Sequence, residues 1–323
     1  MSIPFRLEFD PKPFENKIQI GQQFMLMGSC FTEHIFERLN SYKFICTQNP
    51  HGILFNPVSI FTALHHYLDK SFIETEDLFE VQGLWRHWNF HSSLSRADKN
   101  ETLDTMNHSI QEGADCIKKA DWLILTLGSA FVYYHNEIPV SNCHKVPATE
   151  FEKKLLTSEN ILLEFEKVFH KLKLNNPNLK LILTISPVRH LRDGFIENNR
   201  SKAVLINTVD RICAAHKDVV YFPSYELIID DLRDYRFYAE DMVHPNYLAT
   251  KYVWNKFVQT AFDGSTKEIL KVIDEIKCAY QHKAQHPDSS DHEKFRLKYR
   301  NRVSELSIRF PNMDLRNELL HFS

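Results

Sequence analysis

The chain has 323 residues, of which 43% are hydrophobic and 25% are charged, and its formal net charge at pH 7 is -3. This size and composition are typical of a folded protein with a full hydrophobic core, here one large α/β domain with an appendage. The small net charge gives no reason to expect a nucleic acid or an anionic membrane surface as a partner.

The N-terminal segment and the cysteines indicate the cellular compartment. Arg6 and Asp10 lie where a secretory signal would need a continuous apolar run, and no uncharged run elsewhere reaches membrane-spanning length. The six cysteines are widely spaced and form no CxxC pair, which is typical of reduced thiols. We therefore expect a cytoplasmic protein with no membrane partner.

Short apolar runs predict five buried parallel strands, at 24–27, 44–46, 122–127, 179–185 and 219–222. Between them, apolar residues recur at intervals of three and four and predict helices, most clearly at 57–68, 101–120, 158–173, 199–216 and 245–262. This alternation predicts a three-layer α/β/α fold, with a five-stranded parallel sheet between two layers of helices. Ligands of such folds bind at the carboxyl ends of the strands.

The chain changes character after Gly264. Charged residues become dense, helical periodicity continues, and a single Pro-Asp-Ser-Ser break interrupts it at 287–290. We predict a helical C-terminal extension over 264–323, after a first domain over 1–263. Because basic and acidic residues are mixed there, a solvated helical surface is favoured over a binding arm.

The segment FMLMGSCFTEHIFERL, at 24–39, is the first motif with chemical meaning. A strand pattern ends and a helical pattern begins at Gly28, Ser29 and Cys30. Enzymes with α/β folds often place a nucleophile at such a junction, because backbone amides converge there and the helix dipole favours negative charge. Cys30 and Ser29 are therefore candidate nucleophiles, against the alternative of a tight turn with Cys30 packed inside.

The segment YAEDMVHPNYLATKYVW, at 238–254, is the second motif. Asp241 precedes His244 by three residues, and Pro245 is expected to open a helix. A carboxylate in that position can accept the imidazole N–H and fix the tautomer, which is the support that a general base needs. The alternative is a helix-capping Asp beside a surface His, since so short a motif often occurs without function.

Four segments together resemble one known family. They are GSCFT at 28–32, NCHKVP at 142–147, SPVRHLRDGFIENNRSKAVL from Ser186, and RFYAEDMVHPN at 236–246. Over about 24–262 the chain resembles the GSCFA domain family, a branch of the SGNH/GDSL hydrolase superfamily. The resemblance implies an SGNH-hydrolase or flavodoxin-like sheet for the first domain.

The resemblance also implies roles for the first motif. The superfamily carries Gly-Asp-Ser in this block with Ser as nucleophile, so aligning on Gly28 places Cys30 at the nucleophile position. That favours Cys30, and Ser29 stays open as the alternative. A thiol at a helix N-terminus beside a histidine such as His244 is expected to have a lowered pKa and to form a reactive thiolate.

The oxyanion hole is predicted from the same resemblance. Gly52 matches the glycine of the second block, and its amide is expected to act with the amide of residue 30. The third block of the superfamily has an asparagine where this chain has Ala130, so Ser129 or Asn142 would have to supply the donor. Losing one such donor typically lowers the rate by about 100- to 1000-fold, so a weakened activity is compatible with this sequence.

Two further segments are expected to line a substrate pocket. His91 and Trp88 lie in a segment that mixes aromatic faces with hydrogen-bonding groups, which suits a sugar or another polar ring. A structural loop packed by its aromatics is the alternative for that segment. Arg189 and His190 follow the fourth strand, where an arginine can clamp a carboxylate or phosphate. An ion pair with a nearby carboxylate, Asp193 or Glu197, is the alternative for the arginine.

His144, which follows Cys143, is a further candidate for substrate binding. Thiolate and imidazole groups also suit zinc, so a metal-dependent hydrolase is a minor alternative. Adjacent residues lack the spacing of common zinc loops, and we assign no metal ligands. No glycine-rich phosphate loop occurs in the chain, and we predict no cofactor.

The sequence therefore predicts an SGNH-like ester hydrolase or acyltransferase that works through an acyl-enzyme, with a small-molecule or carbohydrate ester as substrate. The alternative is a non-catalytic module that keeps the fold and only binds a ligand. In an enzyme, His244 must lie within reach of Asp241 and of Cys30 or Ser29. In a binding module, Cys30 would point into the core. The sequence assigns no oligomeric state.

Overall fold

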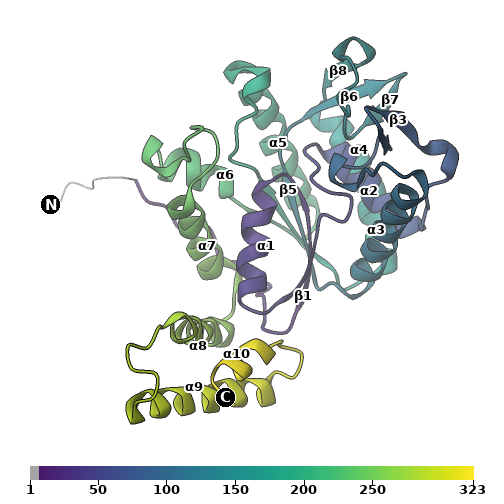
Figure 1. Cartoon of the computed structure of the whole chain (residues 1–323). Helices are drawn as coiled ribbons and strands as arrows, with labels where there is room; N and C mark the ends of the chain where they lie inside the picture. The colour runs from purple at the N-terminus through teal and green to yellow at the C-terminus, as the bar shows by residue number, and fades with distance from the viewer. Residues whose placement is uncertain (1–6) are drawn as a thin grey trace.

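The structure, a computed structural model, describes residues 7–323 and has a parallel sheet at its centre (Figure 1). The sheet has the order β10-β9-β5-β1-β2, with strands β1 (Gln23–Gly28), β2 (Ile45–Gln48), β5 (Trp122–Leu127), β9 (Lys180–Ile185) and β10 (Val219–Phe222). Every neighbouring pair is parallel. Counted along the chain, this is the flavodoxin-like order 2-1-3-4-5. Residues 1–6, with which the predicted first domain begins, lie outside the described residues.

Helices cover both faces of this sheet because its strands are apolar on both sides. Successive residues of β1 alternate between two cores: Met25 and Met27 pack on one side, and Phe24 and Leu26 on the other. The first core is closed by α2 (Pro57–Asp69), α3 (Lys99–Lys119), α4 (Ser158–Asn175) and α5 (Phe195–Ala215). The second is closed mainly by α1 (Phe31–Ser41), α7 (Tyr247–Ala261) and α8 (Gly264–Gln281). The predicted three-layer α/β/α fold class is confirmed.

The C-terminal region is helical, as predicted. It comprises α8, α9 (Ser290–Arg309) and α10 (Arg316–His321), and it adds Ile273, Val303 and Phe322 to the core that α1 and α7 share. Figure 1 shows these helices at the opposite end of the molecule from β6–β8. The domain boundary at 263 stays a prediction.

Two small sheets were absent from the sequence prediction. β3 (Phe79–Val81) and β4 (Leu84–Arg86) form a hairpin, and β6 (Phe131–His135), β7 (Ile138–Val140) and β8 (Glu152–Leu155) form an antiparallel sheet. All four residues of β8 are exposed, so this strand carries no hydrophobic pattern that could reveal it. The antiparallel sheet begins four residues after β5 ends, and so it stands over the carboxyl ends of the central strands.

One helix start differs from the prediction. Pro245 was expected at the first helical position, but α7 begins at Tyr247, after an N-cap at Asn246. The Asn246 side chain accepts hydrogen bonds from the amides of Leu248 and Ala249, while Pro245 forms a bridge with Tyr238. Pro245 and Asn246 therefore precede the helix, and the segment before them, which carries Asp241 and His244, forms a turn in which Met242 has a φ of +58°. The short α6 (Ser224–Glu226) follows β10.

No helix within residues 7–323 combines the length and the apolar character that crossing a membrane requires.

Candidate active site

Cys30, His244 and Asp241 form a chain of side-chain contacts. Cys30 is the N-cap of α1, two residues after β1 ends, and its Sγ lies 3.6 Å from Nε2 of His244. The other ring nitrogen of His244, Nδ1, lies 2.6 Å from Oδ2 of Asp241. The structure thus brings the two sequence motifs together. The thiol side chain points to the imidazole and not into the core.

The Asp241 carboxylate sets the tautomer of His244. Its Oδ1 accepts the backbone amides of Val243 at 2.9 Å and His244 at 3.0 Å. The backbone and side-chain hydrogen bonds from His244 lower the pKa of Asp241 to about 2, so the carboxyl is ionised at neutral pH. A carboxylate can only accept, so Nδ1 must carry the proton of the neutral ring. The lone pair of Nε2 then faces Sγ of Cys30.

The Cys30 thiol differs from the sequence expectation in its acidity. Burial raises the pKa of Cys30, and the negative charge of Glu33 raises it further. The backbone N–H groups of Cys30 and Phe31 and the ammonium of Lys202 oppose these effects without overcoming them. The expectation of a lowered thiol pKa is therefore wrong for this state of the protein. A neutral thiol needs a base to remove its proton during attack, and His244 is the group in contact with it.

Ser29 is placed differently from Cys30. Its side chain is 1% exposed, and in the described part of the chain its Oγ makes no hydrogen bond. Gly28 explains why the turn runs this way. Its φ is +137°, and a Cβ there would overlap the carbonyl oxygen of Thr126 on the neighbouring strand β5. The turn thus brings Cys30, and not Ser29, to His244.

The loop after β2 ties three strand ends together. The amide of Leu54 donates to Gly28 O at 3.1 Å, and the amides of Gly128 and Ser129 both donate to Phe55 O, at 2.7 and 2.9 Å. Asn49 adds a fourth link, because its Oδ1 accepts the amide of Gly28 at 2.8 Å. The backbone around Cys30 is therefore held from two sides.

The amide of residue 30, predicted to be an oxyanion donor, is not used by another backbone group. Within residues 7–323, the N–H groups of Cys30 and Phe31 have no acceptor other than the Cys30 sulfur. The amide of Gly52 is not available, because it donates to Asn49 O at 2.7 Å. Gly52 has a φ of +79° and lies against His91, so it is a turn glycine, which corrects the oxyanion assignment made for it.

The two other predicted donors lie at the pocket described below. Ser129 Oγ accepts the amide of Phe131 at 3.1 Å and contacts Ser201 Oγ at 3.2 Å, so it is largely committed. Asn142 Oδ1 accepts the amide of His144 at 2.8 Å. The Nδ2 group of Asn142 makes no hydrogen bond within the described residues, and it remains a free donor.

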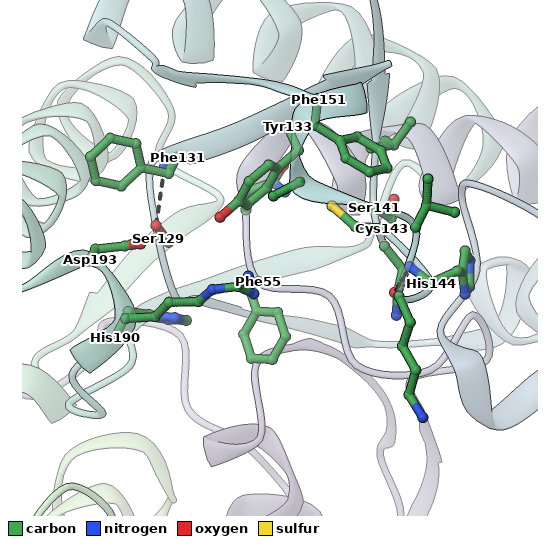
Figure 2. Close-up of a pocket in the computed structure, with 17 residues that line it drawn as sticks. Phe55, Ser129, Phe131, Tyr133, Ser141, Cys143, His144, Phe151, His190 and Asp193 are labelled. Carbon is green, nitrogen blue, oxygen red and sulfur yellow. Dashed lines mark hydrogen bonds between the residues drawn. The ribbon is translucent and has the colours of Figure 1, made fainter.

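A cavity of about 500 Å³ opens beside the strand ends that surround Cys30, and Phe55, Ser129 and His190 line it. Figure 2 shows His190, Ser129 and Asp193 on one side of it and Cys143 and His144 on the other. Aromatic rings and polar groups share its lining, which includes Phe55, Asn56, Phe131, Tyr133, Asn142, Lys145, Phe151 and Arg192. Cys30 and His244 are outside the lining. His190 lies between the cavity and the turn that carries Cys30. Gly128 shows this closeness, because a Cβ added to it would lie 3.4 Å from His190 Nε2 and 3.3 Å from Ser29 Cβ.

Two of the predicted substrate residues line this cavity. The His190 ring packs edge-on against Phe55 at 5.3 Å, and its ring nitrogens have no hydrogen bond in the part of the chain that is described. Both ring nitrogens of His144 already have partners within the protein: Nε2 contacts His87 O at 2.8 Å, and Nδ1 contacts Arg86 at 3.4 Å. Burial lowers the pKa of both His144 and His190 to about 4, so both rings are neutral at pH 7.

The other three predicted substrate residues lie outside the lining. Trp88 stacks on Phe79 at 4.0 Å and packs edge-on against Phe151, which lines the cavity. His91 Nδ1 contacts Ser93 Oγ at 2.9 Å. Arg189 lies near Tyr238, where its positive charge acts on the phenol. Neither carboxylate suggested for the arginine pairs with it: Asp193 contacts Lys153, and Glu197 contacts Arg200.

Sequence reasoning missed a polar face of α5. Asn198, Ser201 and Lys202 are each no more than 2% exposed and reach the strand ends below the cavity. Asn198 Oδ1 accepts the amide of His190 at 3.0 Å, and Ser201 Oγ accepts the amide of Ala130 at 2.7 Å. Their spacing of three and four was the available signal, because it places the three polar residues on one face of the helix.

Among the described residues, no group of three or more His, Cys, Asp or Glu side chains is arranged to hold a metal ion.

Comparison with known proteins places the chain in a family. The model of the GSCFA family matches residues 23–257, and the model of the GSCFA domain protein, C-terminal domain, matches residues 273–323. The chain therefore belongs to the GSCFA family, which confirms the resemblance seen in its motifs. No curated protein matches the chain in sequence.

Several solved structures are similar at 10% sequence identity. One, from Streptococcus pneumonia, is provisionally described as a platelet activating factor; its TM-score is 0.39, and 74% of this chain and 84% of that chain are covered. A carbohydrate esterase family 3 protein from Talaromyces cellulolyticus has a TM-score of 0.34, with 79% and 99% covered. A carbohydrate esterase family 2 enzyme from Corynascus thermopiles has a TM-score of 0.35, with 82% and 69% covered. The family assignment rests on the two family models alone.

Proposed function

We propose that this protein is an acyl-transfer enzyme that cleaves an ester through a thioester on Cys30. The contact chain from Cys30 Sγ through the His244 ring to Asp241 carries the proposal, because it supplies a nucleophile, a base and an orienting carboxylate in order. A binding module would have no need for this order. Ser29, whose buried Oγ makes no hydrogen bond within residues 7–323, is not assigned a role in attack.

The proposed first half-reaction forms the thioester. Sγ of Cys30 attacks the ester carbonyl carbon while its proton passes to Nε2 of His244. The negative charge that develops on the carbonyl oxygen would be met by the free amides of Cys30 and Phe31. Collapse of this intermediate breaks the bond to the alkoxy group, and that group leaves as an alcohol with the proton from His244.

The second half-reaction releases the acyl group. Water attacks the thioester carbonyl with His244 as base, and the Cys30 thiol is restored with the proton that His244 holds. If an alcohol takes the place of water, the same steps transfer the acyl group to a new ester. Hydrolysis and acyl transfer therefore differ only in the acceptor that reaches the site.

The cavity beside the site supports a small polar substrate. Aromatic faces such as Phe55 and Tyr133, together with the free amide donor of Asn142, are groups that bind a sugar ring or a similar polar ring. An acylated carbohydrate is accordingly our proposed substrate class. His190 is free to donate or accept a hydrogen bond at the border between cavity and nucleophile.

The proposal is tested by turnover of p-nitrophenyl acetate and p-nitrophenyl butyrate. We expect Cys30→Ala and His244→Ala to lower kcat/KM by at least about 100-fold, and Ser29→Ala to stay within a few-fold of the wild type. A wild-type rate equal to that of Cys30→Ala with both esters would overturn the proposal and favour the binding module. A loss confined to Ser29→Ala would instead move the nucleophile to Ser29.

A further inference from the structure

The charged groups that line the cavity beside the candidate site are unbalanced. Lys145 and Arg192 both line it, and within residues 7–323 neither cation pairs with a carboxylate. Asp193 is the one carboxylate in the described part of the lining, and its Oδ1 accepts a hydrogen bond from Lys153. The Lys153 ammonium also lies 4.1 Å from the centre of the Phe131 ring, which belongs to the same lining. The charge of Asp193 is thus offset, and the charges of Lys145 and Arg192 are not.

The two unpaired cations come from opposite walls of the cavity. Figure 2 shows His144 and Asp193 on opposite sides, and Lys145 and Arg192 are their neighbours in the chain. The loop that carries Lys145 is held in place, because Asn142 Oδ1 accepts the amide of His144 at 2.8 Å and both ring nitrogens of His144 have partners. A negatively charged group on a ligand in the cavity would therefore be attracted from both walls.

The neutral polar groups of the lining include more free donors than free acceptors. Asn56 Oδ1 accepts the amide of Ser59 at 2.8 Å, and Asn142 Oδ1 is also in use, so within the described residues each side chain keeps a free NH₂ group. Tyr133 and Ser141 add hydroxyls, which can donate or accept. The hydroxyls of a neutral sugar need acceptors as well as donors. An ionised carboxylate or phosphate mainly accepts, and it fits this lining better.

We propose that the cavity selects an acylated sugar that carries a carboxylate or a phosphate, with that group held between Lys145 and Arg192. The planar guanidinium of Arg192 suits two oxygens of one such group, whereas Lys145 acts as a point charge. The sugar ring would lie against aromatic side chains of the lining, such as Phe55 and Tyr133. The role of this sugar as a substrate rests on the acyl transfer proposed above. The preference for an anion does not, because it concerns the cavity alone.

Cys143 gives a direct probe of the preference, because its free thiol lines the same cavity. Iodoacetate and iodoacetamide alkylate the same thiolate and differ in charge, so the ratio of their rates does not depend on the pKa of the thiol. The ratio is measured at about pH 8.5 and low salt by mass spectrometry of the Cys143 peptide. We expect iodoacetate to be favoured about 3- to 10-fold more in the folded protein than in the urea-unfolded protein. Added salt should reduce this difference.

Three variants assign the preference to the two cations. Lys145→Gln and Arg192→Gln should each lower the ratio, and the double variant should bring it to the value of the unfolded protein. Lys154→Gln is the matched control. Lys154 is an exposed lysine of the same small sheet, but it pairs with Glu152 at 2.8 Å and lies outside the lining, so the ratio should stay at the wild-type value.

Protection of Cys143 from iodoacetamide tests the sugar itself. The probes are glucuronate, galacturonate and the 6-phosphates of glucose and galactose, each compared with neutral glucose and galactose. We expect charged sugars to slow the alkylation at concentrations where the neutral sugars do not, and the double variant to lose this protection. Protection by the sugar acids alone identifies a carboxylate as the group bound, and protection by the sugar phosphates alone identifies a phosphate.

Three results would overturn the inference: a reagent ratio equal in folded and unfolded protein, an equal fall of the ratio in Lys154→Gln, or no advantage of charged over neutral sugars. An anion preference in a protein that turns over no ester would leave the selectivity of the cavity intact and refute the proposed acyl transfer. Turnover that depends on Cys30 without any anion preference would refute the inference alone. The two claims therefore fail separately.

Discussion

His244 Nε2 lies 3.6 Å from Cys30 Sγ, although 214 positions separate the two residues in the chain. The parallel sheet makes this contact possible, because β1 ends at the turn with Cys30 and the segment before α7 returns to the same edge. Asp241, three residues before His244, completes the chain of contacts. The predictions below test what this arrangement does and what holds it in place.

Asp241→Asn should lower kcat/KM by about 100- to 10,000-fold. An amide can turn its NH₂ group toward His244, which favours the tautomer that has its lone pair on Nδ1 and points a proton at Cys30. Asp234→Asn is the matched control, since Asp234 is also an exposed aspartate that accepts a backbone amide two residues ahead, and it pairs with Arg236 instead. Steady-state kinetics with both variants checks this. Equal activity of Asp241→Asn and the wild type would contradict an orienting role.

Gly28→Ala should destabilise the protein by about 2–5 kcal/mol, because it adds both a strained φ and an overlap with the Thr126 backbone. Gly83→Ala is the control. Gly83 also has a positive φ, +72°, but nothing lies within 4 Å of the added Cβ, so only about 1–2 kcal/mol should be lost. Urea unfolding measures both values. If the two variants lose the same free energy of unfolding, the close approach of Gly28 to Thr126 does not contribute to stability.

The free energy of unfolding should fall as the pH drops from 6.5 to about 4. Burial is the largest cause that lowers the pKa of His87, His144 and His190 to about 4. Between pH 6.5 and 4 these histidines are protonated in the unfolded chain but neutral in the folded one. Each histidine then lowers the free energy of unfolding by up to about 1.4 kcal/mol per pH unit. Denaturant unfolding at several pH values gives the slope. His144→Gln should make it shallower, and an unchanged slope would show that His144 takes up its proton in the folded state.

The central sheet and the meeting of the two motifs could be predicted from sequence. Buried parallel strands are short, apolar runs, and β5 and the strand at 219–222 have the predicted bounds. Because the carboxyl ends of such strands share one edge, residues that follow them are brought together whatever their separation. The meeting of the two segments follows from this general rule, and the local turn at Gly28 then decides that Cys30, and not Ser29, faces His244.

Other features depend on details that no periodicity encodes. Gly52 looked like a donor, but its amide is used by Asn49, a bond that only the loop geometry decides. The raised pKa of Cys30 depends on its burial in three dimensions and on Glu33 one turn along α1. The buried polar residues of α5, Lys202 among them, were not singled out from the sequence, because a sequence does not show which side of α5 meets the strand ends.

The most direct test of the central claim is mass spectrometry of the acid-quenched protein after brief mixing with p-nitrophenyl acetate. Peptide mapping should find one acetyl group on the peptide with Cys30, and hydroxylamine should remove it as it removes thioesters. The adduct should be absent from Cys30→Ala and strongly reduced in His244→Ala, and Ser29→Ala should retain it. An acetyl group on Ser29, or turnover with no adduct on Cys30, would contradict the account.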